Sequence, residues 1–163
     1  MMINIGDKIP NSTCMKFGSK GIEKIKIGDY VKDKKVVIFA VVGAFTPLCS
    51  NDHLPGYVKN YDAFKKKGID EIICISVNDP FVMAGWAKVE KIDHKLTMLS
   101  DWNADFTKSM GLTFDATALG LGTRSQRYSA LVEKGILKLL EVEIDPKMCT
   151  VSGADVILQA LEE

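Results

Sequence analysis

The sequence Val36-Val37-Ile38-Phe39-Ala40-Val41-Val42 runs directly into Gly43-Ala44-Phe45-Thr46-Pro47-Leu48-Cys49-Ser50. The first seven residues are all apolar and mostly β-branched or aromatic, which is typical of a central strand buried on both faces of a sheet. Glycine, threonine and proline then mark a change of backbone direction. Cys49 therefore stands where a buried strand gives way to a helix.

A thiol in that position is a candidate nucleophile. The first turn of a helix has unpaired N–H groups and the positive end of the macrodipole, and both favour a thiolate. Lowering a cysteine pKa by about 2 units from about 8.5 requires about 2.7 kcal/mol, whereas a helix terminus supplies about 0.3–1 kcal/mol, or about 2 when partly buried. We therefore expect a cationic partner elsewhere in the chain.

A second buried strand is predicted over 72–77. Between the two strands, apolar residues recur at helical spacing from about Ser50 to Lys67, with Gly68 as the stop: Leu54, Tyr57, Val58, Tyr61 and Phe64. The two strands and the helix form one β-α-β unit.

The remaining elements follow in order. Asn78-Asp79-Pro80 predicts an N-cap and a helix through about Glu90, followed by a strand near 96–99 and a short helix over 105–110. Residues 111–122 are expected to be a loop. An antiparallel hairpin is predicted over 127–142 with its turn at Gly135, and Ser152-Gly153-Ala154-Asp155 resembles a capping box for a final helix.

This order of elements indicates an α/β fold, a thioredoxin-like three-layer sandwich with a mixed central sheet flanked by helices. With 163 residues, of which 47% are hydrophobic, the chain fits one domain over residues 1–163.

Composition argues against several classes of partner. Twenty-one basic residues balance twenty-one acidic ones, so no general attraction to nucleic acid or to an anionic membrane is expected. The N-terminus lacks the pattern of a secretory signal, and the longest apolar run is too short to cross a bilayer. We expect a cytoplasmic protein, or an organellar one if a transit peptide has been removed.

The four cysteines stand at Cys14, Cys49, Cys74 and Cys149. They form no C-x-x-C pair and have no histidine at zinc-site spacing, so neither a metal site nor a thioredoxin redox motif is expected. Individual reactive thiols remain open.

The segment GAFTPLCSNDHLPGYV, residues 43–58, resembles the active-site segment of the peroxiredoxins, and specifically that of the type II or peroxiredoxin 5-like subfamily. The family signature is P-x-x-x-T-x-x-C; Thr46 and Cys49 match it, and Val42 replaces its proline. Further matches are Ser76-Val77-Asn78-Asp79-Pro80-Phe81-Val82 and Arg127-Tyr128-Ser129. The resemblance runs in order through nearly the whole chain.

The resemblance implies a thiol peroxidase that reduces hydrogen peroxide and alkyl hydroperoxides without metal, haem, flavin or any other cofactor. Cys49 would attack the peroxide and become a sulfenic acid, Thr46 would place its hydroxyl against the peroxide, and Arg127 would supply the fixed cation, with Arg124 as its rival. The peroxide pocket would be formed by residues of the same segment: Val42, Gly43, Phe45, Pro47 and Leu48. Valine in place of proline adds an N–H group and leaves the rate and the sensitivity to overoxidation open.

Each of these residues also has a structural interpretation. Cys49 could be an inert buried thiol, Thr46 a turn residue, Arg127 a surface cation and Pro47 a matter of backbone geometry. His53, one turn after Cys49, could be a general base, but a solvated or backbone-bonded histidine is the favoured interpretation.

The resolving step is open. Cys74 lies within a predicted buried strand, and Cys149 precedes the last helix about two residues out of register with the family's resolving cysteine; Cys14 is expected to be a small apolar filler. If no internal thiol reaches Cys49, glutathione with glutaredoxin, or thioredoxin, would reduce the sulfenic acid.

The resulting prediction is a peroxiredoxin-type enzyme that forms a homodimer, with Phe45, Phe81 and Val82 as candidate interface residues. One alternative is a redox sensor or relay that passes oxidation from Cys49 to a partner protein. A thioredoxin-like binding domain without catalysis is a third possibility, which the threonine and arginine disfavour.

Overall fold

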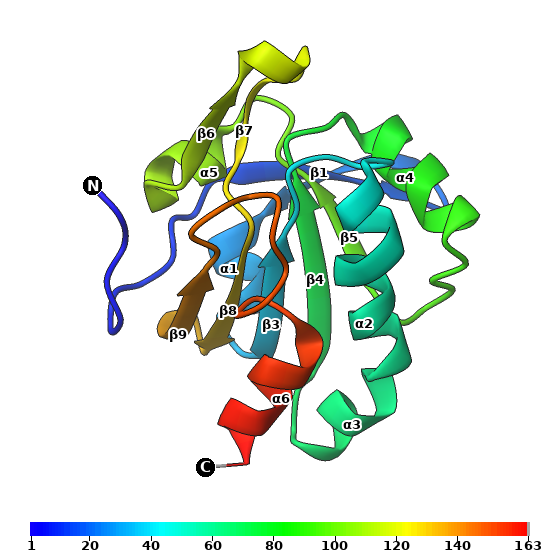
Figure 1. Cartoon of the computed structure of the whole chain (residues 1–163). Helices are drawn as coiled ribbons and strands as arrows, with labels where there is room; N and C mark the ends of the chain where they lie inside the picture. The colour runs from blue at the N-terminus through cyan, green and yellow to red at the C-terminus, as the bar shows by residue number, and fades with distance from the viewer. Residues whose placement is uncertain (163) are drawn as a thin grey trace.

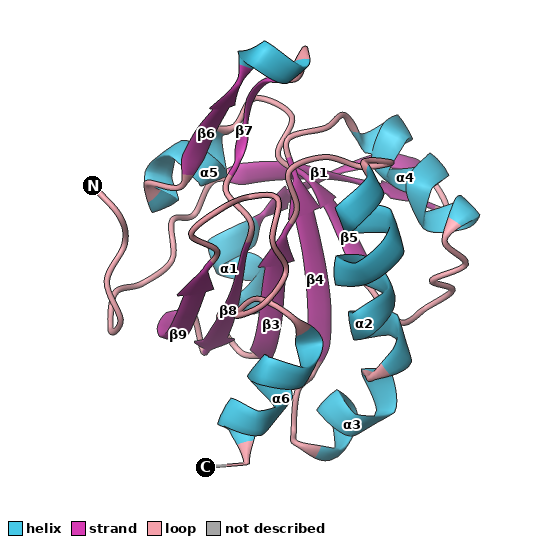
Figure 2. Cartoon of the chain, in the orientation of Figure 1, coloured by secondary structure: helices cyan, strands magenta, loops and turns pink. Residues whose placement is uncertain are grey.

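The computed structural model describes residues 1–162 and is built around one mixed sheet (Figures 1 and 2). Its strands, in spatial order, are β2 (Gly21–Lys26), β1 (Thr13–Gly18), β5 (Thr97–Ser100), β4 (Glu71–Ser76), β3 (Lys35–Ala40), β8 (Tyr128–Glu133) and β9 (Ile136–Val142). The three central strands β3, β4 and β5 are parallel, whereas β1, β8 and the outer strands pair antiparallel.

Helices cover both faces of the sheet, which confirms the three-layer thioredoxin-like sandwich. On one face lie α1 (Ile27–Val31) and α5 (Asp105–Met110); on the other lie α2 (Leu54–Lys59), α3 (Tyr61–Lys66), α4 (Pro80–Val89) and α6 (Ala154–Leu161). Alternate residues of each central strand point to opposite faces, so both faces need apolar cover.

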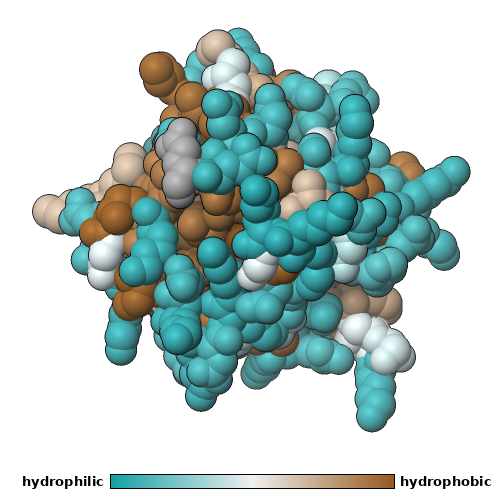
Figure 3. Space-filling model, turned by 90° about the horizontal axis from the view of Figure 1, so that it is seen from below, coloured by the Kyte–Doolittle hydropathy of each residue, from teal (hydrophilic) through white to brown (hydrophobic). Residues whose placement is uncertain are grey.

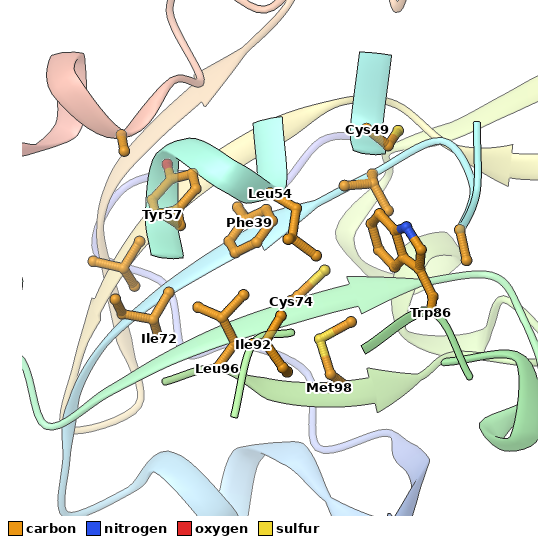
Figure 4. Packing of buried hydrophobic residues seen from close by; sticks show 14 of the residues in the cluster. Phe39, Cys49, Leu54, Tyr57, Ile72, Cys74, Trp86, Ile92, Leu96 and Met98 are labelled. Atoms are coloured by element: carbon orange, nitrogen blue, oxygen red, sulfur yellow. The ribbon is translucent and has the colours of Figure 1, made fainter. Parts of the chain in front are cut away.

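The core under α2 and α4 supports the helix that follows Cys49 (Figure 4). Phe39 of β3 stacks on Tyr57 with ring centroids 4.2 Å apart, and the Trp86 indole N–H donates to the Ser50 hydroxyl at 2.9 Å. Cys74 is buried in this cluster, as its mid-strand position predicts.

Most predicted elements are present close to their expected limits. Asp79 caps α4 by accepting from the Val82 N–H at 2.8 Å, and Pro80 occupies the first helical position. The β8–β9 turn uses Lys134 and Gly135, both with positive φ, as a type I′ hairpin turn requires.

Three expectations need correction. The predicted loop 111–122 contains β6 (Thr113–Ala116), which pairs with β7 (Gly122–Ser125) in a small second sheet. These strands were missed because they are short and largely exposed, so their sequences show no alternation of apolar and polar residues. The helix predicted as continuous to Lys67 is interrupted at Asn60, whose side chain donates to the Gly56 carbonyl at 2.7 Å.

The capping-box prediction for the last helix was also wrong. Gly153 is the N-cap residue of α6 and provides no side-chain cap, because the Ser152 hydroxyl is already committed to Glu143 at 2.6 Å. The β1–β2 hairpin and α1 were not predicted, since β2 is largely exposed and lacks a clear apolar alternation.

Among residues 1–162, no helix has the length and apolar character needed to cross a membrane. The face seen from below in Figure 3 is mostly hydrophilic, with apolar side chains reaching it in patches.

Candidate active site

Strand pairing brings Arg127 to Cys49. Strands β3 and β8 are antiparallel with Ala40 opposite Tyr128, so the residue before Tyr128 lies at the carboxyl end of β3, where the chain continues toward Cys49. The Arg127 Nη2 group donates to the Cys49 Sγ atom at 3.0 Å, across 78 positions of sequence, and both side chains are buried. The cation expected from the thiol's position is therefore present.

The segment between β3 and Cys49 is held by hydrogen bonds. The Ala44 N–H donates to the Asn78 side chain at 2.9 Å, which ties this loop to the end of β4. The Thr46 hydroxyl donates to the Gly43 carbonyl at 2.7 Å and so closes the turn that starts the helix. Because that bond uses the hydroxyl proton, the Thr46 oxygen keeps lone pairs that can accept from a substrate.

The helix begins at Pro47, and its second part, Cys49–His53, is a π-helical turn that leads into α2. Such turns are rare and are found frequently at functional sites. Cys49 lies in the first turn, as the sequence predicts, and faces the interior beside Arg127.

The Arg127 guanidinium is held by all three of its nitrogens. In addition to the bond to Cys49, Nε donates to the Pro146 carbonyl at 3.1 Å and Nη1 lies 3.0 Å from His53 Nδ1. Arg124, the rival cation, makes no hydrogen bond to the thiol, because its Nε donates to the Leu121 carbonyl at 2.9 Å and its Nη1 lies beside Gly43. The structure therefore places Arg127, not Arg124, on the thiol.

His53 is buried and backbone-bonded, not solvated. Its Nε2 atom lies 3.1 Å from the Ser152 carbonyl. Burial, followed by the nearby Arg127 charge, lowers the pKa of His53 from 6.5 to about 3. The imidazole is consequently neutral near pH 7, and sequence analysis did not anticipate its contact with Arg127.

An open cavity of about 330 Å³ lies beside these residues. Its wall includes Val42, Thr46, Pro47, Leu48, Arg127 and residues 145–147. It is completed by apolar residues of β6 and of the connection from β6 to β7, Phe114, Leu119 and Leu121. These last three were missed because only the tertiary fold brings 114–121 over the helix start.

Gly43 and Phe45, which were predicted to line the pocket, are not among the cavity residues. Phe45 has a φ of 66° and a side chain that is 52% exposed, so the turn directs it to the surface. Gly43 has no side chain to contribute, and its carbonyl is occupied by Thr46.

The other three cysteines are separate from this contact, and all four are free thiols. Burial raises the pKa of Cys14 and of Cys74, which lie within strands. Cys149, in the loop before α6, is half-buried, and burial followed by the nearby Asp52 charge raises its pKa to about 11. None of the three has the environment of an activated thiolate.

Comparisons with known proteins agree with this geometry. The redoxin family model matches residues 4–158. The chloroplastic peroxiredoxin-2E of Arabidopsis thaliana is 40% identical over 163 residues, covering 98% of this chain and 69% of the relative. Reduced Prx3 of Vibrio vulnificus in complex with hydrogen peroxide has a TM-score of 0.94 at 43% identity, covering 98% of this chain and 99% of the other. The Plasmodium falciparum antioxidant protein, a 1-Cys peroxiredoxin, has a TM-score of 0.92 at 31% identity, with coverage of 98% and 99%.

A thioredoxin-like sheet that holds a buried cysteine against an arginine defines a thiol-dependent peroxidase, an oxidoreductase. The chain belongs to the redoxin family, within which it is a peroxiredoxin of the type II, peroxiredoxin 5-like group. Enzymes of this class reduce peroxides and are recycled by thiol reductants.

Proposed function

We propose that Cys49 is the peroxidatic cysteine and that Arg127 and Thr46 complete the catalytic group. The observation that carries this proposal is the 3.0 Å contact between Arg127 Nη2 and Cys49 Sγ in a site where the other two guanidinium nitrogens also have partners. A fixed cation at that distance favours the thiolate over the thiol. It also stabilises negative charge that develops on the peroxide oxygens.

The reaction balances with these residues alone. The Cys49 thiolate attacks the terminal oxygen of ROOH, the O–O bond breaks, and the sulfur becomes a sulfenic acid. The leaving RO⁻ takes up a proton from solvent water and departs as an alcohol, or as water when the substrate is hydrogen peroxide. Thr46 accepts a hydrogen bond from the peroxide, while Arg127 holds the oxygen that becomes negative.

The apolar wall beside the site favours alkyl hydroperoxides together with hydrogen peroxide as substrates. Val42, where the family signature has proline, is only 7% exposed and lies in this wall.

The sulfenic acid is reduced by an external thiol, either glutathione with glutaredoxin or thioredoxin. Cys74 is enclosed in β4, so it cannot leave the core without breaking the sheet. Cys149 faces Asn51, Asp52 and Gly56 on the outer side of the helix, whereas Cys49 faces inward to Arg127. A disulfide between them would require the π-helical turn to unwind. The 1-Cys relative from Plasmodium falciparum also supports this mechanism.

A homodimer is the oligomeric state that we propose. Phe45 and Phe81 are 52% and 65% exposed, and Phe81 contacts Phe17 with ring centroids 5.6 Å apart. Exposed aromatic side chains of this kind favour a protein interface. Val82 is partly buried against the core, so it contributes less.

We place the enzyme in a reducing compartment, because its turnover requires Cys49 to be returned to the thiol by a thiol reductant. The cytoplasm is the simplest choice, and the chloroplastic relative is the argument for an organelle.

The test of the catalytic assignment compares two arginines. Arg127→Ala should slow the alkylation of Cys49 at pH 7 and should slow the reaction with peroxide by about 100-fold, the range found for the loss of one fixed donor to a transition state. Arg124→Ala is the matched control and should change both by less than about threefold. Stopped-flow kinetics and the rate of alkylation at pH 7 provide the measurements, and equal effects of the two changes would overturn the assignment.

A further inference from the structure

The acceptors that hold the Arg127 guanidinium are neutral. They are the Pro146 carbonyl on Nε and the His53 ring on Nη1. The two salt bridges found among residues 1–162 join other residues, so no carboxylate of this part of the chain forms an ion pair with the Arg127 guanidinium. The positive charge is therefore left for Cys49.

The hydrogen bonds determine which nitrogen of His53 carries the proton. A carbonyl only accepts, so Nε2 must donate to the Ser152 carbonyl at 3.1 Å. The Nδ1 atom consequently keeps its lone pair and accepts from Arg127. The Ser152 carbonyl thus orients the imidazole ring, and the ring in turn holds Arg127 Nη1.

Pro146 and Ser152 belong to the segment 144–152, which lies between β9 and α6 and has no regular secondary structure. The Ser152 carbonyl also accepts from the Tyr57 and Ser129 hydroxyls at 2.8 and 2.6 Å. The N–H groups and hydroxyls of Thr150 and Ser152, in contrast, converge on one buried carboxylate. Glu143, which is 3% exposed, accepts at Oε2 from the Thr150 N–H, the Ser152 N–H and the Ser152 hydroxyl at 2.8, 2.8 and 2.6 Å, and at Oε1 from the Thr150 hydroxyl at 2.8 Å. Its own N–H donates to the Arg127 carbonyl at 2.9 Å.

We propose that Glu143 is a positioning residue for peroxide reduction, because its hydrogen bonds fold 144–152 so that the Pro146 and Ser152 carbonyls fix the Arg127 guanidinium against Cys49. The proposal rests on the catalytic role assigned above to Cys49 and Arg127. Glu143 acts through the loop and does not touch the reacting atoms. Its geometry matters more than its charge, since a carboxylate in direct contact with the guanidinium would compete with the thiolate.

Two conservative variants of Glu143 distinguish the effect of side-chain length from the effect of charge. Glu143→Gln keeps the length and one strong acceptor; its carbonyl can take the three bonds at Oε2, while the Thr150 hydroxyl reverses to accept from the new NH₂ group. Glu143→Asp keeps the charge but is shorter by one methylene and cannot reach both donor residues. We expect the Gln variant to lie within about threefold of the wild type in its rate with peroxide, since the positioning is retained.

Glu143→Asp and Glu143→Ala should lower the second-order rate constant for peroxide by about 10-fold or more, because misplacement by about 1 Å can cost that much. In both variants, the alkylation of Cys49 at pH 7 should also slow. Glu71→Ala is the matched control, since Glu71 also accepts from Tyr30, Lys34 and Thr97 but lies at the opposite end of the sheet. It should lower the unfolding midpoint and leave both Cys49 measurements unchanged.

An Arg127→Ala background distinguishes failure of this proposal from failure of the proposed function. In that background Glu143→Asp should lower the rate constant for peroxide little further, because the arginine that Glu143 positions is absent. If Arg127→Ala alone has no effect, the catalytic assignment fails. If Arg127→Ala is impaired but the Asp variant matches the wild type, or if the Gln variant is the impaired one, the positioning role of Glu143 is overturned. The Asp variant keeps the test available if the Ala variant does not fold.

Discussion

Stability should fall between about pH 7 and pH 5 because of one buried histidine. The pKa of His53 is lowered from 6.5 to about 3, chiefly by burial and then by Arg127. In this interval His53 binds a proton in the unfolded chain but stays neutral in the folded chain. The stabilising effect of a neutral His53 is therefore fully present above about pH 6.5 and is lost as the pH falls toward about 3.

The magnitude follows from the size of the interval. Each pH unit below 6.5 removes about 1.4 kcal/mol, so the free energy of unfolding should drop by about 2 kcal/mol between about pH 7 and pH 5. Urea unfolding at both pH values measures this directly. His53→Gln should remove most of the pH dependence, whereas the change at the exposed residue, His94→Gln, should leave it intact. A wild-type loss below about 0.5 kcal/mol, or a full slope in the His53 variant, would refute the reasoning.

Three further outcomes are expected. Cys49→Ser should abolish peroxidase turnover with the fold retained, since a serine hydroxyl is not a comparable nucleophile at neutral pH; turnover above a few per cent of wild type in a coupled assay would contradict this. One equivalent of peroxide should give a sulfenic acid, or a mixed disulfide when glutathione is present, by intact mass spectrometry; a stoichiometric Cys49–Cys149 disulfide with turnover lost in Cys149→Ser would instead indicate internal resolution. Phe81→Asp should shift the protein toward monomer in light scattering. Val89→Asp is the matched control, because Val89 is also exposed on α4. Equal masses for the two variants would argue against an interface at Phe81.

The sequence alone predicts the centre of the fold well. β3, β4 and the helix between them are long or strongly apolar, and their patterns are unambiguous. Pro80 and Gly135 mark boundaries because their preferred backbone angles leave few alternatives. The short strands β2, β6 and β7 were not predicted, since four to six half-exposed residues carry too little alternation to identify them.

For the site, the sequence determined that a thiol stands in the first turn of a helix after a buried strand, and that this position needs a cation. The motif around Cys49 and the residues at Arg127 then indicated the chemistry. Local spacing and residue type are sufficient for these conclusions, because they depend on neighbours along the chain.

Only the tertiary structure decided which arginine meets the thiol and what holds it there. Antiparallel pairing of β3 with β8 sets Arg127 against Cys49 and directs Arg124 to Leu121. The Pro146 acceptor is a backbone carbonyl, which every residue type possesses, so no pattern of side chains could have revealed it. Likewise, His53 becomes a neutral partner of Arg127 only once folding has buried both, because burial is what sets the protonation state of its ring.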